Sequence, residues 1–163
     1  MILAFAHPGI VVPDLEAASE FYAAMFGFRV IGEEGWKDSP AVDRAIGSRG
    51  SASRGLMMAG HNCFLELWEY AAPEQDAGAP GDRGPHQQGI RHLAFCVDDC
   101  ELEYKRLLAL GGQALGEPVG GVVYCRDPFG NILELCEIPV PQEDPTTLPG
   151  VSSLDNFPHQ EDG

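Results

Sequence analysis

The chain contains the same module twice, and this internal repeat constrains its fold more than any other feature of the sequence. Residues 7–28 read HPGIVVPDLEAASEFYAAMFGF, and residues 92–112 read HLAFCVDDCELEYKRLLALGG. Each copy starts at a histidine in a short apolar run, reaches an aspartate seven residues later, and continues with helical spacing to a glycine at position +20. Each module is therefore predicted to begin with a strand followed by a helix.

Aspartates and glycines mark the ends of the two predicted helices. Asp14 precedes the first, and Asp98 or Asp99 can cap the second. Gly27 and Gly111 or Gly112 are the expected C-terminal stops. Each helix has one apolar stripe, formed by Leu15, Ala18, Tyr22 and Met25 in the first and by Tyr104, Leu107, Leu108 and Gly111 in the second.

The ends of the modules repeat as well. Residues 65–69 are LELWE and residues 133–137 are LELCE, each in an apolar segment of period two that follows a turn signal. Weaker strands are expected at 27–34, 54–59, 113–119 and 121–126. The prediction is an α+β fold in which two βαβββ modules form a cupped mixed sheet with flanking helices.

One domain, residues 1–140, is expected to hold both modules. The first covers about 3–70, a linker rich in Ala, Pro and Gly covers 71–89, and the second covers about 90–138. The acidic, proline-rich tail, 141–163, is expected to be flexible. The first module is longer by 17 residues around 36–53, with a possible helical turn at 41–46, and an insertion beside a site usually shapes its pocket.

The charge balance excludes some classes of partner. With 25 Asp and Glu against 10 Lys and Arg, the net charge is -15, which repels nucleic acid and anionic lipid. The sequence shows neither a signal peptide nor an apolar run long enough to span a membrane, so we expect a cytoplasmic protein without nucleic-acid or membrane partners. The 5 cysteines include no C-x-x-C pair, which fits neither a disulfide framework nor a zinc ribbon.

A histidine and a glutamate occupy matching positions in both modules. His7 and His92 lie in the first strands, and Glu66 and Glu134 each stand between two leucines in the last strands. A carboxylate there is costly unless it is paired or bound to a cation. Period-two alternation directs both glutamates to the face opposite the helices, the concave face of the sheet. We therefore predict that His7, Glu66, His92 and Glu134 bind one divalent transition metal per site.

The ligand set does not select the metal, because imidazole nitrogen with carboxylate oxygen suits Zn, Ni, Co, Mn or Fe(II). The same alternation puts Phe5, Phe64, Trp68 and Tyr70 on the concave face, as substrate-binding side chains or as ordinary core. Glu69 and Glu137 have the opposite parity, and we expect them to be solvated.

Four motifs in order resemble the vicinal oxygen chelate superfamily. They are H-x6-D with its helix, LEL-x-E, G-x-x-HLAF-x-VDD and RDP-x-GN-x-LEL, and together they span about residues 3–138. Members include glyoxalase I, methylmalonyl-CoA epimerase, extradiol dioxygenases and bleomycin-resistance proteins. The resemblance implies paired βαβββ modules in a glyoxalase-like fold and metal ligands at the same four positions. Val11 and Tyr70 replace the arginine and asparagine that bacterial glyoxalase I uses for glutathione.

Three classes of function remain open at this point. The first is a metal-dependent lyase or isomerase for a small carbonyl compound, in which the metal stabilises enolate-like charge and Glu66 or Glu134 is the base. The second is a non-haem Fe(II) ring-cleavage dioxygenase that uses His7, His92 and Glu134. The third is a small-molecule binding or resistance protein without catalysis.

Although the chain as a whole is acidic, residues 37–54 contain a cluster of basic residues. Arg44, Arg49 and Arg54 lie with Lys37 within residues 37–54, either as solvated charges or as a group that pairs with a substrate carboxylate. The expected substrate is therefore a small carboxylate or an aromatic compound. We expect a homodimer, and the sequence leaves open whether the two modules of one cup come from one chain or from two.

Overall fold

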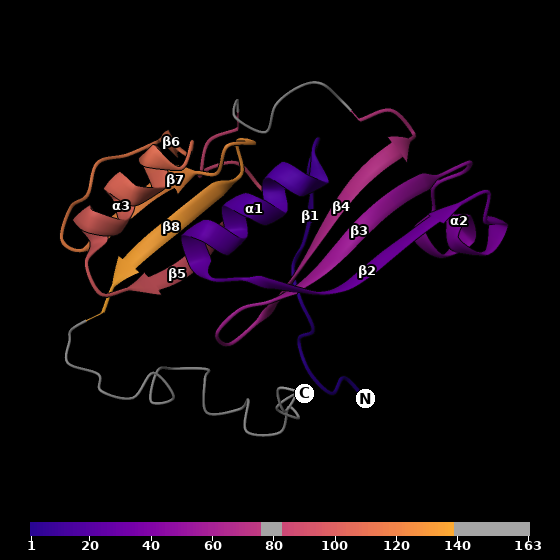
Figure 1. Ribbon diagram of the computed structural model, residues 1–163, viewed down its shortest axis with the longest axis horizontal. Helices are drawn as coiled ribbons and strands as arrows, with labels where there is room; N and C mark the ends of the chain where they lie inside the picture. The colour runs from indigo at the N-terminus through magenta and orange to yellow at the C-terminus, as the bar shows by residue number, and fades with distance from the viewer. Residues whose placement is uncertain (76–82, 139–163) are drawn as a thin grey trace.

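The computed structural model describes residues 1–75 and 83–138, and its two modules repeat one plan (Figure 1). The first contains β1 (Gly9–Val11), α1 (Leu15–Phe26), β2 (Arg29–Lys37), α2 (Pro40–Ile46), β3 (Ala52–Ala59) and β4 (Phe64–Ala72). The second contains β5 (His92–Val97), α3 (Cys100–Ala109), β6 (Gln113–Ala114), β7 (Val122–Arg126) and β8 (Ile132–Glu137). The predicted βαβββ plan is confirmed, and α2 is the helical turn expected in the longer first module.

Each module forms its own four-stranded sheet with the same topology. The strand orders are β1-β4-β3-β2 and β5-β8-β7-β6. The first and last strands of each module are parallel, and the remaining neighbours are antiparallel. β1 and β5 are thus the outer strands of two separate sheets, where the sequence predicted one cupped sheet. Alternation along a strand repeats inside each module, but nothing local specifies how two sheets join.

The helix ends follow the predicted capping residues. The Asp14 carboxylate accepts from the Ala17 N–H at 2.8 Å, and Asp99 accepts from the Leu102 N–H at 2.9 Å. Gly27 ends α1 in the left-handed region with φ 69°. The apolar stripe of α1 is buried as predicted, whereas in α3 Leu107 is buried and Leu108 is 38% exposed.

Glu137 is exposed as expected and the Glu69 side chain is 30% exposed, but each carboxylate also bonds to the start of a helix, which the sequence analysis did not predict. Glu69 Oε2 accepts from the backbone N–H of Leu15 at 2.9 Å, and Glu137 Oε2 accepts from that of Cys100 at 3.0 Å. These are the first residues of α1 and α3, whose N–H groups lack partners within the helix. Each glutamate has the parity of the buried leucines beside it, which directs it to the helix-covered face. There its negative charge also favours the helix N-terminus.

The two modules share one hydrophobic core. Phe26 of α1 stacks on Phe95 of β5 with ring centroids 3.9 Å apart, and the Tyr22 hydroxyl donates to Asp127 Oδ2 at 2.9 Å. Asp127 is fully buried, and burial raises its pKa even though four donors bond to its carboxylate. Burial and the Asp127 charge raise the pKa of Tyr22, so its hydroxyl stays a donor. Helix α1 therefore connects the modules.

Two predicted segments lie partly or wholly outside the described residues: 76–82 within the linker, and the tail 141–163. Within the described ranges, no helix is long and apolar enough to cross a membrane.

Candidate functional site

His7 and Glu66 form the pair expected in the first module. His7 precedes β1, and it is held at the sheet because the carbonyl of Pro8 accepts from the N–H of Glu66 at 3.1 Å. His7 Nε2 lies 3.3 Å from Glu66 Oε2. The two side chains are 31% and 18% exposed, so the pair is half-buried and still open to a ligand.

His92 and Glu134 form the matching pair in the second module. His92 Nε2 lies 3.1 Å from Glu134 Oε2, and the side chains are 37% and 16% exposed. The other carboxylate oxygen, Oε1, accepts from Cys136 Sγ at 3.2 Å. Burial, with the Glu134 carboxylate as a further cause, raises the pKa of Cys136 to about 11, so this sulfur remains a protonated donor at neutral pH.

Tyr124 adds an aromatic hydroxyl to the second pair that sequence reasoning missed. It pairs with Glu134 across β7 and β8, so its side chain lies on the same face of the sheet as that carboxylate. Burial, then the Glu134 charge, raises the pKa of Tyr124. Its ring also packs edge-on against His92, with centroids 5.1 Å apart. Only the antiparallel register of β7 with β8 shows that Tyr124 lies opposite Glu134, and a single sequence does not determine this register. In the first module, Met57 occupies the matching position.

The two pairs remain separate within one chain. In residues 1–75 and 83–138, no group of three or more His, Cys, Asp and Glu side chains is close enough to hold one metal ion. Each pair belongs to a different sheet, and β1 and β5 do not pair with one another. The four-residue ligand set therefore stays a prediction. Within one chain, His7 lies next to Glu66 and His92 lies next to Glu134, but the two pairs do not meet.

Of the aromatic residues predicted to bind substrate, those on β4 share one face of the sheet, whereas Phe5 does not belong to it. Trp68 and Tyr70 share the parity of Glu66 on β4, and both contact Trp36 of β2, which the sequence analysis had not singled out. Phe64 is the first residue of the same strand and has the same parity. Phe5 is 85% exposed and precedes β1, so it contributes nothing to this face within one chain.

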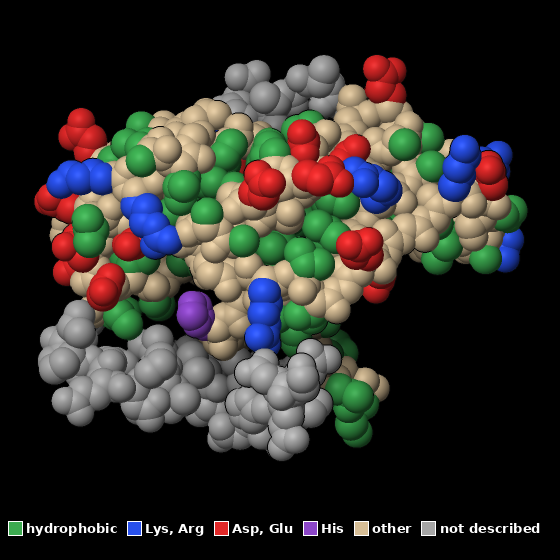
Figure 2. Space-filling view, in the orientation of Figure 1, with side chains coloured by type: hydrophobic (Ala, Val, Ile, Leu, Met, Phe, Trp, Pro, Cys, Tyr) green, Lys and Arg blue, Asp and Glu red, His purple; other side chains and the backbone are tan. Residues whose placement is uncertain are grey.

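The basic residues do not gather around the histidine–glutamate pairs. Arg54 forms a bidentate ion pair with Glu16, at 2.9 and 3.0 Å, and a further contact with Glu69 at 3.1 Å. Its parity is that of Glu69, which puts it on the face of the sheet opposite Glu66. Arg44 in the last turn of α2 and Arg49 just after this helix are exposed, and Figure 2 shows basic side chains gathered at this end of the molecule. Their role in substrate binding stays a prediction, and for Arg54 the local carboxylates already supply partners.

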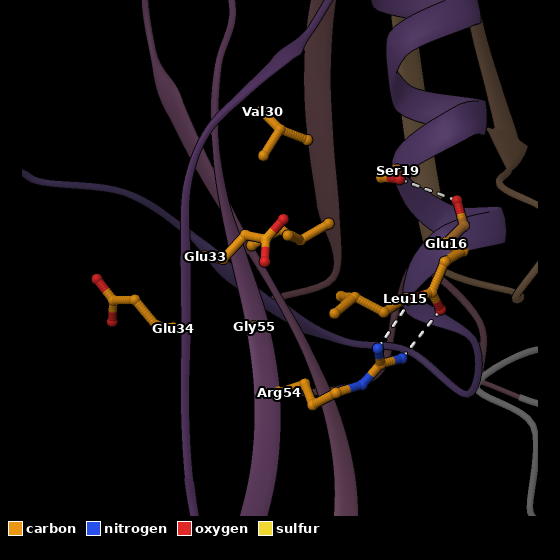
Figure 3. A pocket seen from close by; sticks show the side chains of 9 residues that line it. Leu15, Glu16, Ser19, Val30, Glu33, Glu34, Arg54 and Gly55 are labelled. Carbon is orange, nitrogen blue, oxygen red and sulfur yellow. Dashed lines mark hydrogen bonds and ion pairs between the residues drawn. The ribbon is translucent and has the colours of Figure 1, made fainter.

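A cavity of about 360 Å³ lies beside this ion pair, between α1 and strands β2 and β3 (Figure 3). The Arg54 guanidinium faces the Glu16 carboxylate at its edge, and Glu33 and Glu34 also line it. It is on the helix-covered side of the first sheet, away from Glu66. The cavity beside Arg54 and the histidine–glutamate pairs, whose atoms suit a metal ion, thus lie in different parts of the molecule. The guanidinium in the cavity is already satisfied by carboxylates, so the histidine–glutamate pairs remain the predicted site.

Two βαβββ modules, each with a histidine and a glutamate at its first and last strands, define a chelate-type protein of the kind that the sequence motifs resemble. The chain belongs to the Glyoxalase/Bleomycin resistance protein/Dioxygenase superfamily, whose family model matches residues 4–135.

Similar proteins agree with this assignment. A 2-epi-5-epi-valiolone epimerase from an Actinomyces species is 30% identical over 84% of this chain and 80% of its own length. A glyoxalase family protein of Bacillus cereus has a similar fold, with a TM-score of 0.73 and 21% identity over 84% of this chain and 95% of the other. The fosfomycin resistance protein FosX of Listeria monocytogenes gives a TM-score of 0.58 and 20% identity over 86% and 94%. Another crystal structure of that protein is a complex with Mn(II) and sulfate, at a TM-score of 0.52 and 21% identity over 86% and 96% of the two chains.

Proposed function

We propose that the chain is a divalent-metal-dependent isomerase that epimerises a carbon atom next to the carbonyl group of a small polyhydroxylated ring ketone. The observation that carries the proposal is the repeated pair of one imidazole nitrogen and one carboxylate oxygen, 3.3 and 3.1 Å apart. The epimerase name of the 30% identical relative supports the isomerase class and the ring substrate.

The donor atoms fit a shared cation. Two ligands bound to one metal ion at about 2.1 Å lie roughly 3.0–3.4 Å apart when they subtend about 90–109° at the metal. Both observed separations fall in this range. The ion would be held by His7 and Glu66 on one side and by His92 and Glu134 on the other. When bound, such an ion acts as a Lewis acid for the negative charge that develops on a carbonyl oxygen.

The two carboxylates supply the proton chemistry. Epimerisation breaks a C–H bond next to the carbonyl, moves its electron pair toward the carbonyl group, and returns a proton to the opposite face of the same carbon. No oxidant is consumed. Glu66 and Glu134 approach the site from different sheets, so one can accept the proton while the other donates one from the opposite side. The Cys136 thiol donates to Glu134, which orients its carboxylate, and Tyr124 lies opposite Glu134 on the neighbouring strand.

A second copy of the chain completes the site in this proposal. Each module alone supplies two ligands, and the outer strands β1 and β5 do not pair with one another within the chain, so each leaves an edge that a second copy can meet. A two-fold axis that sets β1 of one copy beside β5 of the other also sets the reverse pair together. The dimer then has two equivalent sites, each with His7 and Glu66 from one copy and His92 and Glu134 from its partner.

The test combines metal analysis with solvent exchange. Protein purified without added metal should contain close to one equivalent of a transition metal per site, and His92→Ala should abolish that stoichiometry. In deuterated water, a pentahydroxycyclohexanone should acquire deuterium next to its carbonyl, as followed by proton NMR. Glu134→Gln should retain the fold and much of the metal and lose the exchange.

The competing classes give different results in the same experiments. A ring-cleavage dioxygenase would consume oxygen with a catechol and would not exchange the ring ketone. A non-catalytic binding protein with a degenerate site would purify without metal. Full metal occupancy in His92→Ala would refute the ligand assignment, and unchanged exchange in Glu134→Gln would remove this carboxylate from the proton transfer.

A further inference from the structure

The two tryptophans of the chain form one cluster beside Glu66. Trp36 of β2 and Trp68 of β4 have ring centroids 4.8 Å apart, and the Tyr70 ring packs edge-on against Trp36 at 5.7 Å. Trp68 follows Glu66 by two residues on β4, so both side chains point to the same face of the sheet. All three aromatic residues are half-buried, which leaves part of the cluster open to a ligand.

Gly55 determines where the Trp68 indole lies. It pairs with Trp68 across β3 and β4, and a Cβ atom at this position would lie 2.4 Å from Trp68 Cε3. No side chain larger than hydrogen fits under the indole, so the ring rests directly on the backbone of the neighbouring strand. The glycine therefore lets the Trp68 ring lie against β3, where any other residue would lift or displace the ring.

The insertion of the first module fixes the second indole. Trp36 Nε1 donates to Ser51 Oγ at 2.7 Å, and Ser51 is 1% exposed. Asp43 of α2 accepts from the Ser51 hydroxyl and N–H and from the N–H of Gly50. These bonds, the Ser51 hydroxyl first, hold the pKa of Asp43 below its ordinary value. The loop and helix that distinguish the first module thus anchor the aromatic cluster.

Among the residues that the structure describes, 83–138, the second module has no equivalent surface. On β8, Cys136 occupies the position two residues after Glu134, and its partner on β7 is Val122 in place of a glycine. A completed site with one half from each module would therefore have an aromatic side and a side of polar donors. This asymmetry is what recognition of a ring requires, because one face stacks while the edges form hydrogen bonds.

We propose that the Trp68 ring, supported by the tilted ring of Trp36, forms the platform on which the ring of the substrate stacks, and that Gly55 is a specificity-determining residue because it makes room for that platform. The identity of the ring rests on the proposed function. Side chains two residues apart on a strand are about 6.6 Å apart, roughly the width of a six-membered ring. A ring ketone whose oxygens reach the Glu66 pair then lies over Trp68. Its C–H face, apolar when the hydroxyls are equatorial, covers the indole.

Intrinsic fluorescence tests the platform directly, since both tryptophans of the chain belong to it. The probe is scyllo-inositol, a ring polyol with every hydroxyl equatorial and no carbonyl, added to the protein as purified. We expect it to change the tryptophan emission saturably, whereas erythrulose, a ketose too short to close a ring, should not. Because scyllo-inositol undergoes no reaction, this result stands apart from the success or failure of the epimerase proposal.

Two identical substitutions give the matched comparison. Gly55→Ala should weaken scyllo-inositol binding about tenfold, which is the magnitude of one lost stacking contact, at unchanged metal content. Gly32→Ala is the control, because its Cβ would meet only Met57 Cβ at 3.8 Å in the same sheet. Should Gly55→Ala fail to fold, Trp68→Leu, with Trp36 as the remaining reporter, makes the same test by loss of the scyllo-inositol response.

Each other outcome overturns the proposal. Equal affinity of scyllo-inositol for Gly55→Ala and Gly32→Ala would mean that the indole position does not matter. A fluorescence response to catechol and none to scyllo-inositol would assign the surface to aromatic ligands. Absence of any response to either ring would make the cluster a packing surface for the second copy.

Discussion

Mixing two inactive variants tests how the site is assembled. His7→Ala removes a ligand of the first module, and His92→Ala removes one of the second. Each homodimer has a defect in every site, whether the sites lie within one chain or between two. In a mixed dimer with shared sites, one site receives both altered modules and the other receives both intact ones. The separation of the two pairs within one chain therefore predicts that mixing restores activity.

The magnitude follows from random pairing. When the two variants are unfolded and refolded together in equal amounts, about half of the dimers are mixed, and one of the two sites in each mixed dimer is intact. About a quarter of the wild-type sites should then return. We expect about a quarter of the wild-type metal content and of the solvent exchange rate, compared with wild-type protein refolded in the same way.

The assay has a clear negative result. If each site lies within one chain, every chain in the mixture retains its defect and refolding together restores nothing. Failure to recover metal or exchange in a mixture that size-exclusion chromatography shows to be dimeric would refute the shared site. It would leave the separate question of the reaction to the exchange experiment on the unaltered protein.

Two predictions concern the buried contact between the modules. Tyr22→Phe removes a hydroxyl that donates to the buried Asp127 carboxylate and should lower the free energy of unfolding in urea by about 1.5–3 kcal/mol. Tyr104→Phe, which removes a bond to a backbone carbonyl at 2.9 Å within one module, should cost about 1 kcal/mol, and equal losses would contradict the special strength of the carboxylate bond. Burial raises the folded pKa of Asp127 above 3.8, so its contribution to stability is complete below the unfolded pKa and is lost as the pH rises through the folded pKa. Acidification from neutral pH toward 4 should therefore favour the wild type relative to Asp127→Asn in urea melts, and a constant difference would show that Asp127 does not titrate in this range.

The repeat made much of the fold predictable. Alternation and capping residues are local signals, so Asp14 and Gly27 marked the ends of α1 correctly, and the LEL segments identified β4 and β8. The same parity argument put Glu66 and Glu134 opposite the helix-covered leucines, where each lies beside its histidine. Local periodicity decides which face a side chain occupies.

Contacts between elements required the tertiary structure. The position of Glu69 at the start of α1 depends on how the helix packs on the sheet, and Tyr124 lies opposite Glu134 only through the register of β7 with β8. Gly55 looked like any strand glycine until the Trp68 ring lay across it. The sequence by itself determined the two modules, their strand faces and the four candidate ligands, since each depends on neighbours along the chain. Only the tertiary structure decided that the ligands stand as two separate pairs, because the joining of sheets depends on surfaces distant in the chain.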